Sequence, residues 1–212
     1  MKKGFMLVCD GSNGAGKTTV IKKIETYLTN KGFDVLLTRE PGGTPIGERI
    51  RSIILDPDSS EMLDITELML FGAARAQHIQ EKIVPALNQG KVVVCDRFDA
   101  ATISFQHYAR GIDINIINQV NNLALAGFSP DMNIILDLDP IIGLERVKSR
   151  GDGLDRMEDE KLDFLNRARD GYLQQAKACP EKFTVIDASQ SQESVANEVI
   201  SVLEQLIKQH SR

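Results

Sequence analysis

Residues 4–19 read GFMLVCDGSNGAGKTT and join a short apolar run to a glycine-rich turn. The run Gly4–Asp10 predicts a buried strand, and the apolar spacing over Lys17–Asn30 predicts a helix. Between them, Gly11–Thr18 fits the pattern G-x-x-x-x-G-K-[ST] at every fixed position. A strand that passes through such a turn into a helix is the context in which this pattern binds phosphate. We therefore expect a phosphate-binding loop near the start of an α/β fold.

The residue types of this loop suit a nucleoside triphosphate. Small residues let successive backbone N–H groups face phosphate oxygens, and the helix that begins at Lys17 directs its positive dipole end at the same point. The Lys17 ammonium would reach the outer phosphates, and the Thr18 hydroxyl would ligate Mg²⁺. The alternative is a glycine-rich turn that only joins the strand to the helix. The residues expected to contact ATP are Gly11, Ser12, Asn13, Gly14, Ala15, Gly16, Lys17, Thr18 and Thr19.

The rest of the chain alternates apolar runs with helical patterns. Further strands are expected over 34–38, 91–95, 132–138 and 182–187, and helices over 51–56, 65–90, 115–126, from Pro140 onward, 158–179 and 193–208. Strands that alternate with helices indicate a parallel sheet with right-handed crossovers. We therefore predict a single α/β domain over residues 1–212, in which helices flank a central parallel sheet of five strands. In such folds ligands bind at the carboxyl ends of the strands.

Composition and charge argue against several classes of protein. A net charge of -5 does not favour a surface that coats nucleic acid. No apolar run approaches the roughly 18 residues that a membrane helix needs. The N-terminal apolar run ends at Asp10 and not at a small-residue cleavage site, which argues against a signal peptide. Because Cys9, Cys95 and Cys179 match no zinc spacing, we expect free thiols in a reducing cytoplasm, with Cys9 and Cys95 buried in strands.

A phosphate-binding loop alone does not name a reaction, because GTPase switch proteins carry the same loop. Such proteins usually recognise guanine with an N-K-x-D segment that follows a strand. The nearest match here is NKGF at 30–33, which ends the first expected helix and lacks the aspartate. The sequence therefore argues against a GTPase.

Three further motifs follow in the chain. REPGGT at 39–44 follows the second expected strand, DRF at 96–98 follows the third, and FGAAR at 71–75 lies in the long expected helix. Together with the phosphate loop, these motifs resemble the thymidylate kinase family, whose members phosphorylate dTMP to dTDP. The resemblance extends from the first strand to the last helix, and REPGGT with a following DR is specific to that family. It implies a P-loop nucleoside monophosphate kinase fold, ATP and Mg²⁺ as cofactors, dTMP as the small-molecule acceptor, and a homodimer.

Acidic and basic side chains near the strand ends suit phosphates and a metal ion. Asp96 closes an apolar strand, where its carboxylate could hold Mg²⁺ opposite Thr18; an N-cap of the following helix is the alternative. The resemblance implies that Arg97 contacts the phosphates of both substrates and that Arg51 clamps the phosphate of dTMP. Arg39 is the other arginine of the acceptor side. On the sequence alone, Arg51 is also compatible with an exposed charge on a helix.

The loop that begins with Glu40 and Pro41 is expected to hold a fixed shape near the acceptor. A residue before proline avoids the helical region, and the two glycines that follow allow the chain to turn. The alternative is a plain turn.

Phe71 and Arg75 are spaced i, i+4 and therefore share one helix face. A ring and a guanidinium suit a pyrimidine base, and the resemblance implies that Phe71 stacks on thymine while Arg75 binds its O4. On sequence alone, a core position for Phe71 is the alternative. By the same resemblance Thr102 and Gln106 are candidates for the base pocket. The ring of Phe105 would pack against the sugar and exclude a 2′-hydroxyl.

The variable positions of the phosphate loop contain no arginine, so other cations must stabilise the charge of the transition state. A glycine-broken segment at about 146–157 is typical of a lid that closes over the phosphates. Its cations are Arg146, Lys148, Arg150 and Arg156. The segment resembles the bacterial type of the family, with arginines in the lid; a solvated basic stretch is the alternative. The residues expected to act in catalysis are Lys17, Arg97, Arg150 and Arg156.

Some positions depart from the family pattern. Asn13 stands where many relatives carry an acid that meets the sugar 3′-hydroxyl; an amide can form this hydrogen bond without a charge. Ala101 stands where serine is usual, and 107–109 replace a glycine-rich run. Besides a dTMP kinase, two functions therefore stay open: a kinase for another pyrimidine monophosphate such as dUMP, and a nucleotide-binding regulator without turnover. The intact Asp96, Arg97 and lid arginines argue against the regulator.

Overall fold

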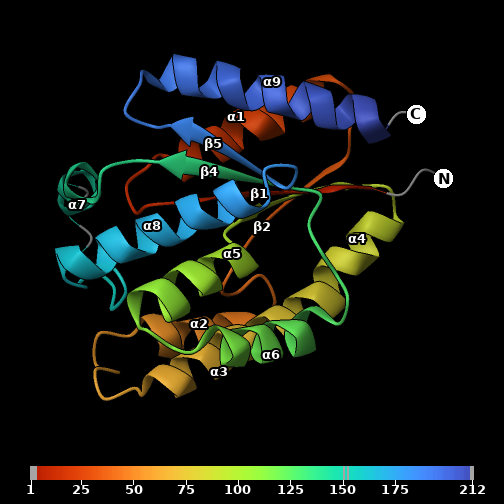
Figure 1. Cartoon of the computed structure of the whole chain (residues 1–212). Helices are drawn as coiled ribbons and strands as arrows, with labels where there is room; N and C mark the ends of the chain where they lie inside the picture. Colours follow the sequence, from red (N-terminus) through yellow and green to blue (C-terminus); the bar gives the residue numbers. More distant parts are fainter. Residues whose placement is uncertain (1–3, 150, 152, 211–212) are drawn as a thin grey trace.

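The computed structural model describes residues 4–149, 151 and 153–210, and its centre is a parallel sheet of five strands. The strands are β1 (Met6–Gly11), β2 (Val35–Arg39), β3 (Val92–Asp96), β4 (Met132–Asp137) and β5 (Phe183–Asp187). Their order is β2-β3-β1-β4-β5, with every neighbouring pair parallel (Figure 1). The predicted α/β class and five-stranded parallel sheet are confirmed. Because β1 is the central strand, the loop after it lies in the middle of the ligand-binding edge.

Helical elements connect the strands and cover both faces of the sheet (Figure 1). They are α1 (Lys17–Asn30), α2 (Pro45–Leu55), α3 (Asp64–His78), the π-helical η1 (Ile79–Ile83), α4 (Val84–Asn88), α5 (Asp99–Thr102), the π-helical η2 (Ile103–Ala109), α6 (Ile114–Leu125), α7 (Pro140–Lys148), α8 (Leu162–Ala178) and α9 (Gln192–His210). On one face α1 packs against α9, and on the other α8 packs along η2. In a separate group, α3 contacts both α2 and α6.

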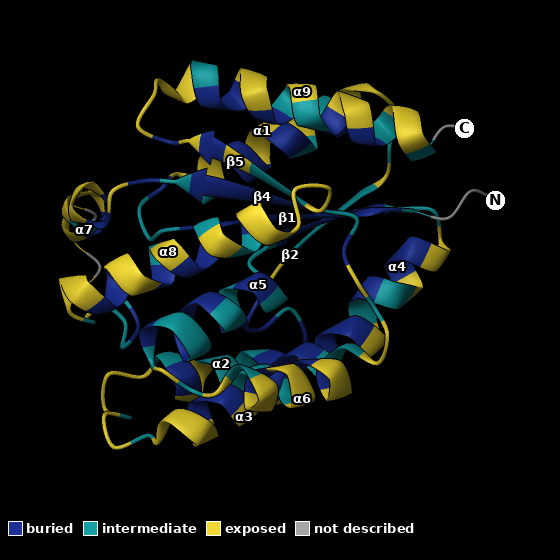
Figure 2. Cartoon of the chain, in the orientation of Figure 1, coloured by how far each residue is buried: buried dark blue, intermediate teal, exposed yellow. Residues whose placement is uncertain are grey.

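Residues of β1 alternate between two hydrophobic clusters. Leu7 and Cys9 pack into the cluster of α1 and α9, whereas Met6 and Val8 pack into the cluster of η1 and α4 on the opposite face. The central strands β1, β3 and β4 are therefore mostly buried, and Figure 2 shows β1 and β4 in dark blue, whereas β2 is half-buried. This double burial explains why the strands read as continuous apolar runs in the sequence.

The long helix expected over 65–90 is interrupted by the π-helical turn η1. Pro85 lies in the first turn of α4 and has no backbone N–H to give to the preceding turn. A π turn before it changes the hydrogen-bond ladder without ending the helical path. The expected helix is thus present, but as three helical elements.

Other helix starts differ from those expected. The helix expected from residue 51 begins at Pro45, where Thr44 accepts a hydrogen bond from the backbone N of Gly47. The helix expected from residue 158 begins at Leu162, because Asp155 accepts from the backbone N atoms of the two residues at 157 and 158 and so holds them in a turn. The sequence did not predict the helical stretch over 99–109, which forms α5 and η2.

The thiols of Cys9 and Cys95 are buried and free, as predicted, and Cys179 is free and exposed. Among the described residues, none of the helices is both long enough and apolar enough to cross a membrane.

Candidate active site

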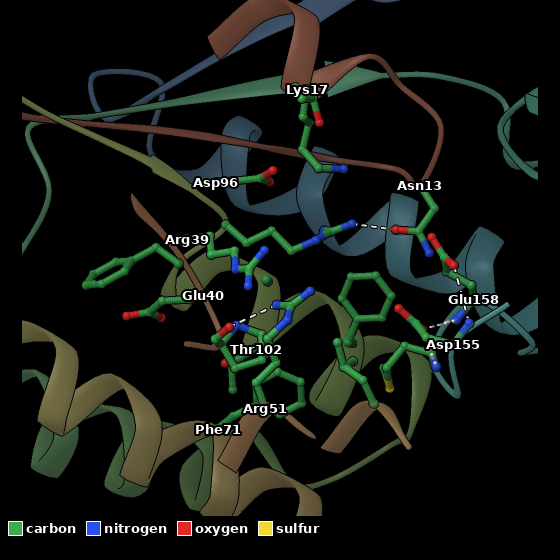
Figure 3. Close-up of a pocket in the computed structure, with 18 of the residues that line it drawn as sticks. Asn13, Lys17, Arg39, Glu40, Arg51, Phe71, Asp96, Thr102, Asp155 and Glu158 are labelled. Atoms are coloured by element: carbon green, nitrogen blue, oxygen red, sulfur yellow. Dashed lines mark hydrogen bonds between the residues drawn. The ribbon is translucent and has the colours of Figure 1, made fainter. Parts of the chain in front are cut away.

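A cavity of about 570 Å³ opens at the carboxyl ends of β1, β2 and β3 (Figure 3). Most of the sequence-predicted site residues line it: Asn13, Gly14, Gly16, Lys17, Thr18, Thr19, Arg39, Glu40, Pro41, Arg51, Phe71, Arg75, Asp96, Arg97, Thr102, Phe105 and Gln106. Gly11, Ser12, Ala15 and Arg156 are not among its lining residues. The predicted catalytic residue Arg150 lies outside the described residues. Five separate stretches of chain therefore meet at one cavity.

The phosphate loop packs against the segment that follows β4, at Leu138 and at Gly143 of α7. Gly14 has a φ of 74°, and a Cβ there would lie 2.3 Å from the carbonyl oxygen of Gly143, so only glycine fits. The Ser12 hydroxyl donates to the carbonyl of Leu138, 3.1 Å away. These contacts hold the loop in one shape at the edge of the cavity, which Asn13, Gly14 and Gly16 line.

The Lys17 ammonium lies inside this loop. It donates to the carbonyls of Gly11 at 3.3 Å and Ser12 at 2.9 Å. Burial, with the nearby positive charge of Arg97, lowers the pKa of Lys17 to about 8. A phosphate oxygen bound there would favour the charged form again.

Thr18 and Asp96 both line the cavity, and Figure 3 shows the Asp96 carboxylate and the Lys17 side chain directed into the same space. Within the described residues, no group of three or more His, Cys, Asp or Glu side chains could hold a metal. Mg²⁺ usually keeps several waters and is bound through one or two carboxylates and substrate phosphates. A hydroxyl and one carboxylate beside a phosphate loop therefore fit Mg²⁺ better than a metal that needs a full protein cage.

Arg97 is held rigidly at the end of β3. Its backbone has a φ of 67°, a left-handed conformation that non-glycine residues seldom adopt. Its guanidinium donates to Asp10 at 3.0 Å, to the hydroxyl of Tyr172 at 2.9 Å and to the side-chain oxygen of Asn13 at 2.5 Å. Burial lowers the pKa of Arg97, but Tyr172 and Asp10 outweigh it and raise this pKa above the usual value. Arg97 is therefore a fixed cation.

The sequence did not single out two of these partners. Asp10 is fully buried, and burial raises its pKa although Arg97 opposes the shift. Tyr172 lies on α8 and donates to Asp10 at 2.5 Å. Asp10 ends an apolar run, which is the same signal that identified Asp96. Tyr172 carries no local signal, because a tyrosine in an amphipathic helix usually indicates core packing.

Residues on the opposite side of the cavity come from several elements, and we call them the acceptor wall. They are Arg39, Glu40, Pro41, Arg51, Phe71, Arg75, Thr102, Phe105 and Gln106. Within it, Arg51 donates to the carbonyl of Pro41 at 2.9 Å, and Arg39 donates to Glu48 at 2.9 Å. Burial and the charge of Arg39 lower the pKa of Arg51. Two guanidiniums that face one cavity favour an anion between them.

Glu40 is buried and joins the loop to α3. It accepts from Arg75 at 2.8 Å and contacts Nδ1 of His78 at 3.0 Å. Lys82 donates to the carbonyl of Gly43 at 2.8 Å, and the Glu40–Pro41 peptide bond is cis. The contacts of Glu40 and of the Gly43 carbonyl therefore fix the loop at both ends, in agreement with the expected fixed shape.

Arg75 is almost wholly buried and makes contacts that the sequence does not indicate. Besides Glu40, it donates to Asn121 at 2.9 Å, to the carbonyl of Phe98 at 3.1 Å and to the hydroxyl of Thr102 at 3.0 Å. The guanidinium has one more N–H donor than these contacts use. Arg75 therefore has a fixed orientation where it lines the cavity.

The loop before α8 forms part of the cavity wall, in a region where the sequence predicts a charged lid. Asp155, Met157 and Glu158 line the cavity, and Figure 3 shows Asp155 and Glu158 together on one side. Arg156 does not line the cavity. It donates to the carbonyl of Ile54 at 2.7 Å and also contacts Glu67. Its predicted catalytic role stays a prediction.

Comparisons with known proteins agree with this geometry. A family model described as "Thymidylate kinase" matches residues 9–199. The chain is 47% identical over 206 residues to the thymidylate kinase of Geobacillus sp. (strain WCH70), covering 96% of this chain and 98% of that protein. It is 40% identical over 200 residues to that of Clostridium novyi (strain NT), covering 94% and 98%. The crystal structure of thymidylate kinase from Ehrlichia chaffeensis matches with a TM-score of 0.77 and 33% identity, covering 95% of this chain and 99% of that one.

Proposed function

The chain belongs to the thymidylate kinase family, and from that premise we propose that it transfers the γ-phosphoryl group of ATP to dTMP, forming ADP and dTDP. One observation carries the proposal. The phosphate loop and the acceptor wall face each other across a single cavity, with Arg97 between them. A donor and an acceptor bound there would meet without water between them, as phosphoryl transfer requires.

At the donor side, the loop amides and Lys17 bind the phosphates of ATP. Thr18 and Asp96 would hold Mg²⁺, which neutralises charge on the outer phosphates when it is bound. Arg97 lies beside both phosphate positions and keeps its charge, so it stabilises the negative charge that spreads over the moving group. A general base is not needed, because the phosphate of the acceptor is already ionised.

At the acceptor side, Arg39 and Arg51 bind the phosphate of dTMP, and the ring of Phe71 stacks on the base. The remaining N–H donor of Arg75 faces the edge of the base. Phe105 packs against the sugar. Further acceptor contacts come from Glu40, Pro41, Thr102, Gln106 and Asn13.

A nucleotide panel tests this function. The protein is incubated with ATP, Mg²⁺ and dTMP, dUMP, dCMP or dAMP, and the release of ADP is measured. We expect the highest kcat/KM with dTMP. Turnover with another monophosphate but not with dTMP would replace the assigned substrate, and binding of nucleotides without any turnover would indicate a regulator.

We also infer that the chain acts as a single catalytic domain, without a nucleic-acid partner, in the cytoplasm, and as a homodimer. Large apolar side chains are exposed on α2, α3 and α6, and Figure 2 shows exposed stretches of α3 and α6 in yellow. They include Ile53 at 50%, Met69 at 59% and Leu123 at 84% exposure. Exposed apolar side chains on helices that contact one another suit a second copy of the chain. Sedimentation should give a dimer for the wild-type protein and a monomer for Met69→Glu; a wild-type monomer would refute the homodimer.

A further inference from the structure

Glu67 on α3 is a buried carboxylate to which the proposed reaction gives no role. Its side chain is only 1% exposed, and it accepts hydrogen bonds from three side chains of distant segments. Gln106 donates to it at 2.8 Å, and Arg110 donates to both of its oxygens, at 3.0 and 3.1 Å. The third donor is Arg156, at 2.5 Å. Hydrogen bonds with Arg110, Gln106 and Arg156 outweigh burial and lower the pKa of Glu67, so it stays ionised.

Arg156 reaches this carboxylate from the loop that contributes Asp155, Met157 and Glu158 to the cavity. Its backbone N donates to the carbonyl of Leu55 at 3.2 Å, and its guanidinium donates to the carbonyl of Ile54 at 2.7 Å. The side chain is 12% exposed. The backbone of Arg156 is therefore bound to α2, and its guanidinium is bound to both α2 and α3, which contribute to the acceptor side of the cavity.

The same contacts determine where Met157 lies. Its sulfur is 3.6 Å from Arg156 and 3.8 Å from Arg110, and its side chain packs in a hydrophobic cluster with Phe105. Met157 and Phe105 both line the cavity. An ion pair one residue away thus holds an apolar side chain against the acceptor wall.

We propose that Glu67 is a positioning residue that anchors the loop 155–158 over the acceptor end of the cavity through Arg156. Arg156 is then an anchor of the loop and not a cation of the transition state. The inference rests on the proposed function for its substrate, because it assigns the loop to the binding of dTMP. Glu67 itself is not among the residues that line the cavity, and it lies one helical turn before Phe71 on α3.

The two roles of Arg156 predict different kinetics. An anchor that shapes the acceptor site contributes equally to substrate and transition-state binding, so its loss raises KM and leaves kcat nearly unchanged. A cation on the moving phosphoryl group acts only in the transition state, so its loss lowers kcat. Arg156→Gln should therefore raise the KM for dTMP about 10-fold and change kcat by less than about 3-fold. A fall in kcat of about 100-fold with an unchanged KM would overturn the proposal.

Glu67→Gln and the double variant complete a mutant cycle with Arg156→Gln. Because both residues act through one ion pair, the double variant should be no worse than the more affected single variant. Effects that multiply would show that the two residues act separately and would overturn the anchor. The control is Asp64→Asn: Asp64 lies in the same helix end and is 3.5 Å from Arg110, but it makes no contact with Arg156. It should leave both kinetic constants unchanged.

Hydrogen exchange of the unliganded protein separates this proposal from the proposed function. The backbone N–H groups of Arg156, Met157 and Glu158 are hydrogen-bonded, and they should exchange about 10-fold faster in Arg156→Gln and Glu67→Gln than in Asp64→Asn. Unchanged exchange would refute the anchor whatever substrate the enzyme uses. Faster exchange in a protein that does not phosphorylate dTMP would keep the anchor and refute the substrate. If Glu67→Gln does not fold, the exchange and kinetics of Arg156→Gln decide the question.

Discussion

The phosphate loop and the acceptor wall face the same cavity but are built in different ways. The loop is one consecutive stretch, and its proposed phosphate contacts come from backbone amides and a single lysine. The acceptor wall combines side chains from β2, α2, α3, α5 and η2, and most of its polar side chains are oriented by a partner from another segment. A backbone cradle depends mainly on local conformation, whereas a wall of side chains depends on tertiary contacts. Mutations in the two regions should therefore change the kinetic constants in different ways.

The sharpest test of the loop is Lys17→Ala. Loss of the ammonium that meets the outer phosphates should lower kcat by about 10³-fold, because that charge acts mainly in the transition state. Binding of dTMP, measured by calorimetry, should change by less than about 3-fold. Lys22→Ala, an exposed lysine on the same helix, serves as the control. An equal loss of turnover and dTMP binding would mean that the two regions are not separate.

The acceptor wall is tested by Arg51→Gln, with the exposed Arg49→Gln as its matched control. Removing one of two guanidiniums from the predicted phosphate position should raise the KM for dTMP about 10- to 100-fold, because a charge-assisted hydrogen bond is lost. The KM for ATP should change little. Steady-state kinetics with each substrate varied in turn measures both constants, and a larger effect on ATP would place Arg51 with the donor.

Tyr172→Phe tests the junction of the two regions. The lost hydroxyl leaves Asp10 and Arg97 each without one partner, so Arg97 should keep its charge but lose its fixed orientation. We expect kcat to fall about 10-fold and the free energy of unfolding to fall by about 1–3 kcal/mol. Tyr27→Phe, which loses only a surface hydrogen bond to Glu204, is the control. A destabilised variant with wild-type kcat would limit Tyr172 to a structural role.

The smallest expected effect concerns the pH dependence of ATP binding. ATP favours charged Lys17, so its affinity should fall as pH rises above the free enzyme's pKa of about 8, and binding near that pH should take up a proton. Calorimetry in buffers of different ionisation enthalpy measures this uptake, and dTMP should cause none at Lys17. In the unliganded protein the lowered pKa of Lys17 means that folding disfavours its charged form. Between the folded pKa of about 8 and the ordinary 10.5, the unfolded state binds more protons, so this group's contribution to the unfolding free energy rises with pH.

The strength of the sequence signal differs between the regions for a physical reason. The loop could be identified from GSNGAGKT, and its place after a buried strand follows from the apolar run before it. Residues of the acceptor wall could be named only through the family resemblance, since nothing local distinguishes Phe71 from a core phenylalanine. Neither approach identified Asp10, Tyr172 or Glu67, because their roles depend on partners 39 or more positions away along the chain.

The sequence by itself determined the α/β class, the parallel sheet and the phosphate loop, because periodicity and glycine spacing are properties of neighbouring residues. Tertiary structure alone decided the direction of the charged side chains. Arg156 has the sequence setting of a lid cation, yet it is bound to Glu67 on α3. Arg97 is aimed by Asp10, Asn13 and Tyr172, which come from β1, the phosphate loop and α8. A long cation can point in many directions, and its orientation is fixed by whichever carboxylate or hydroxyl the fold places within its reach.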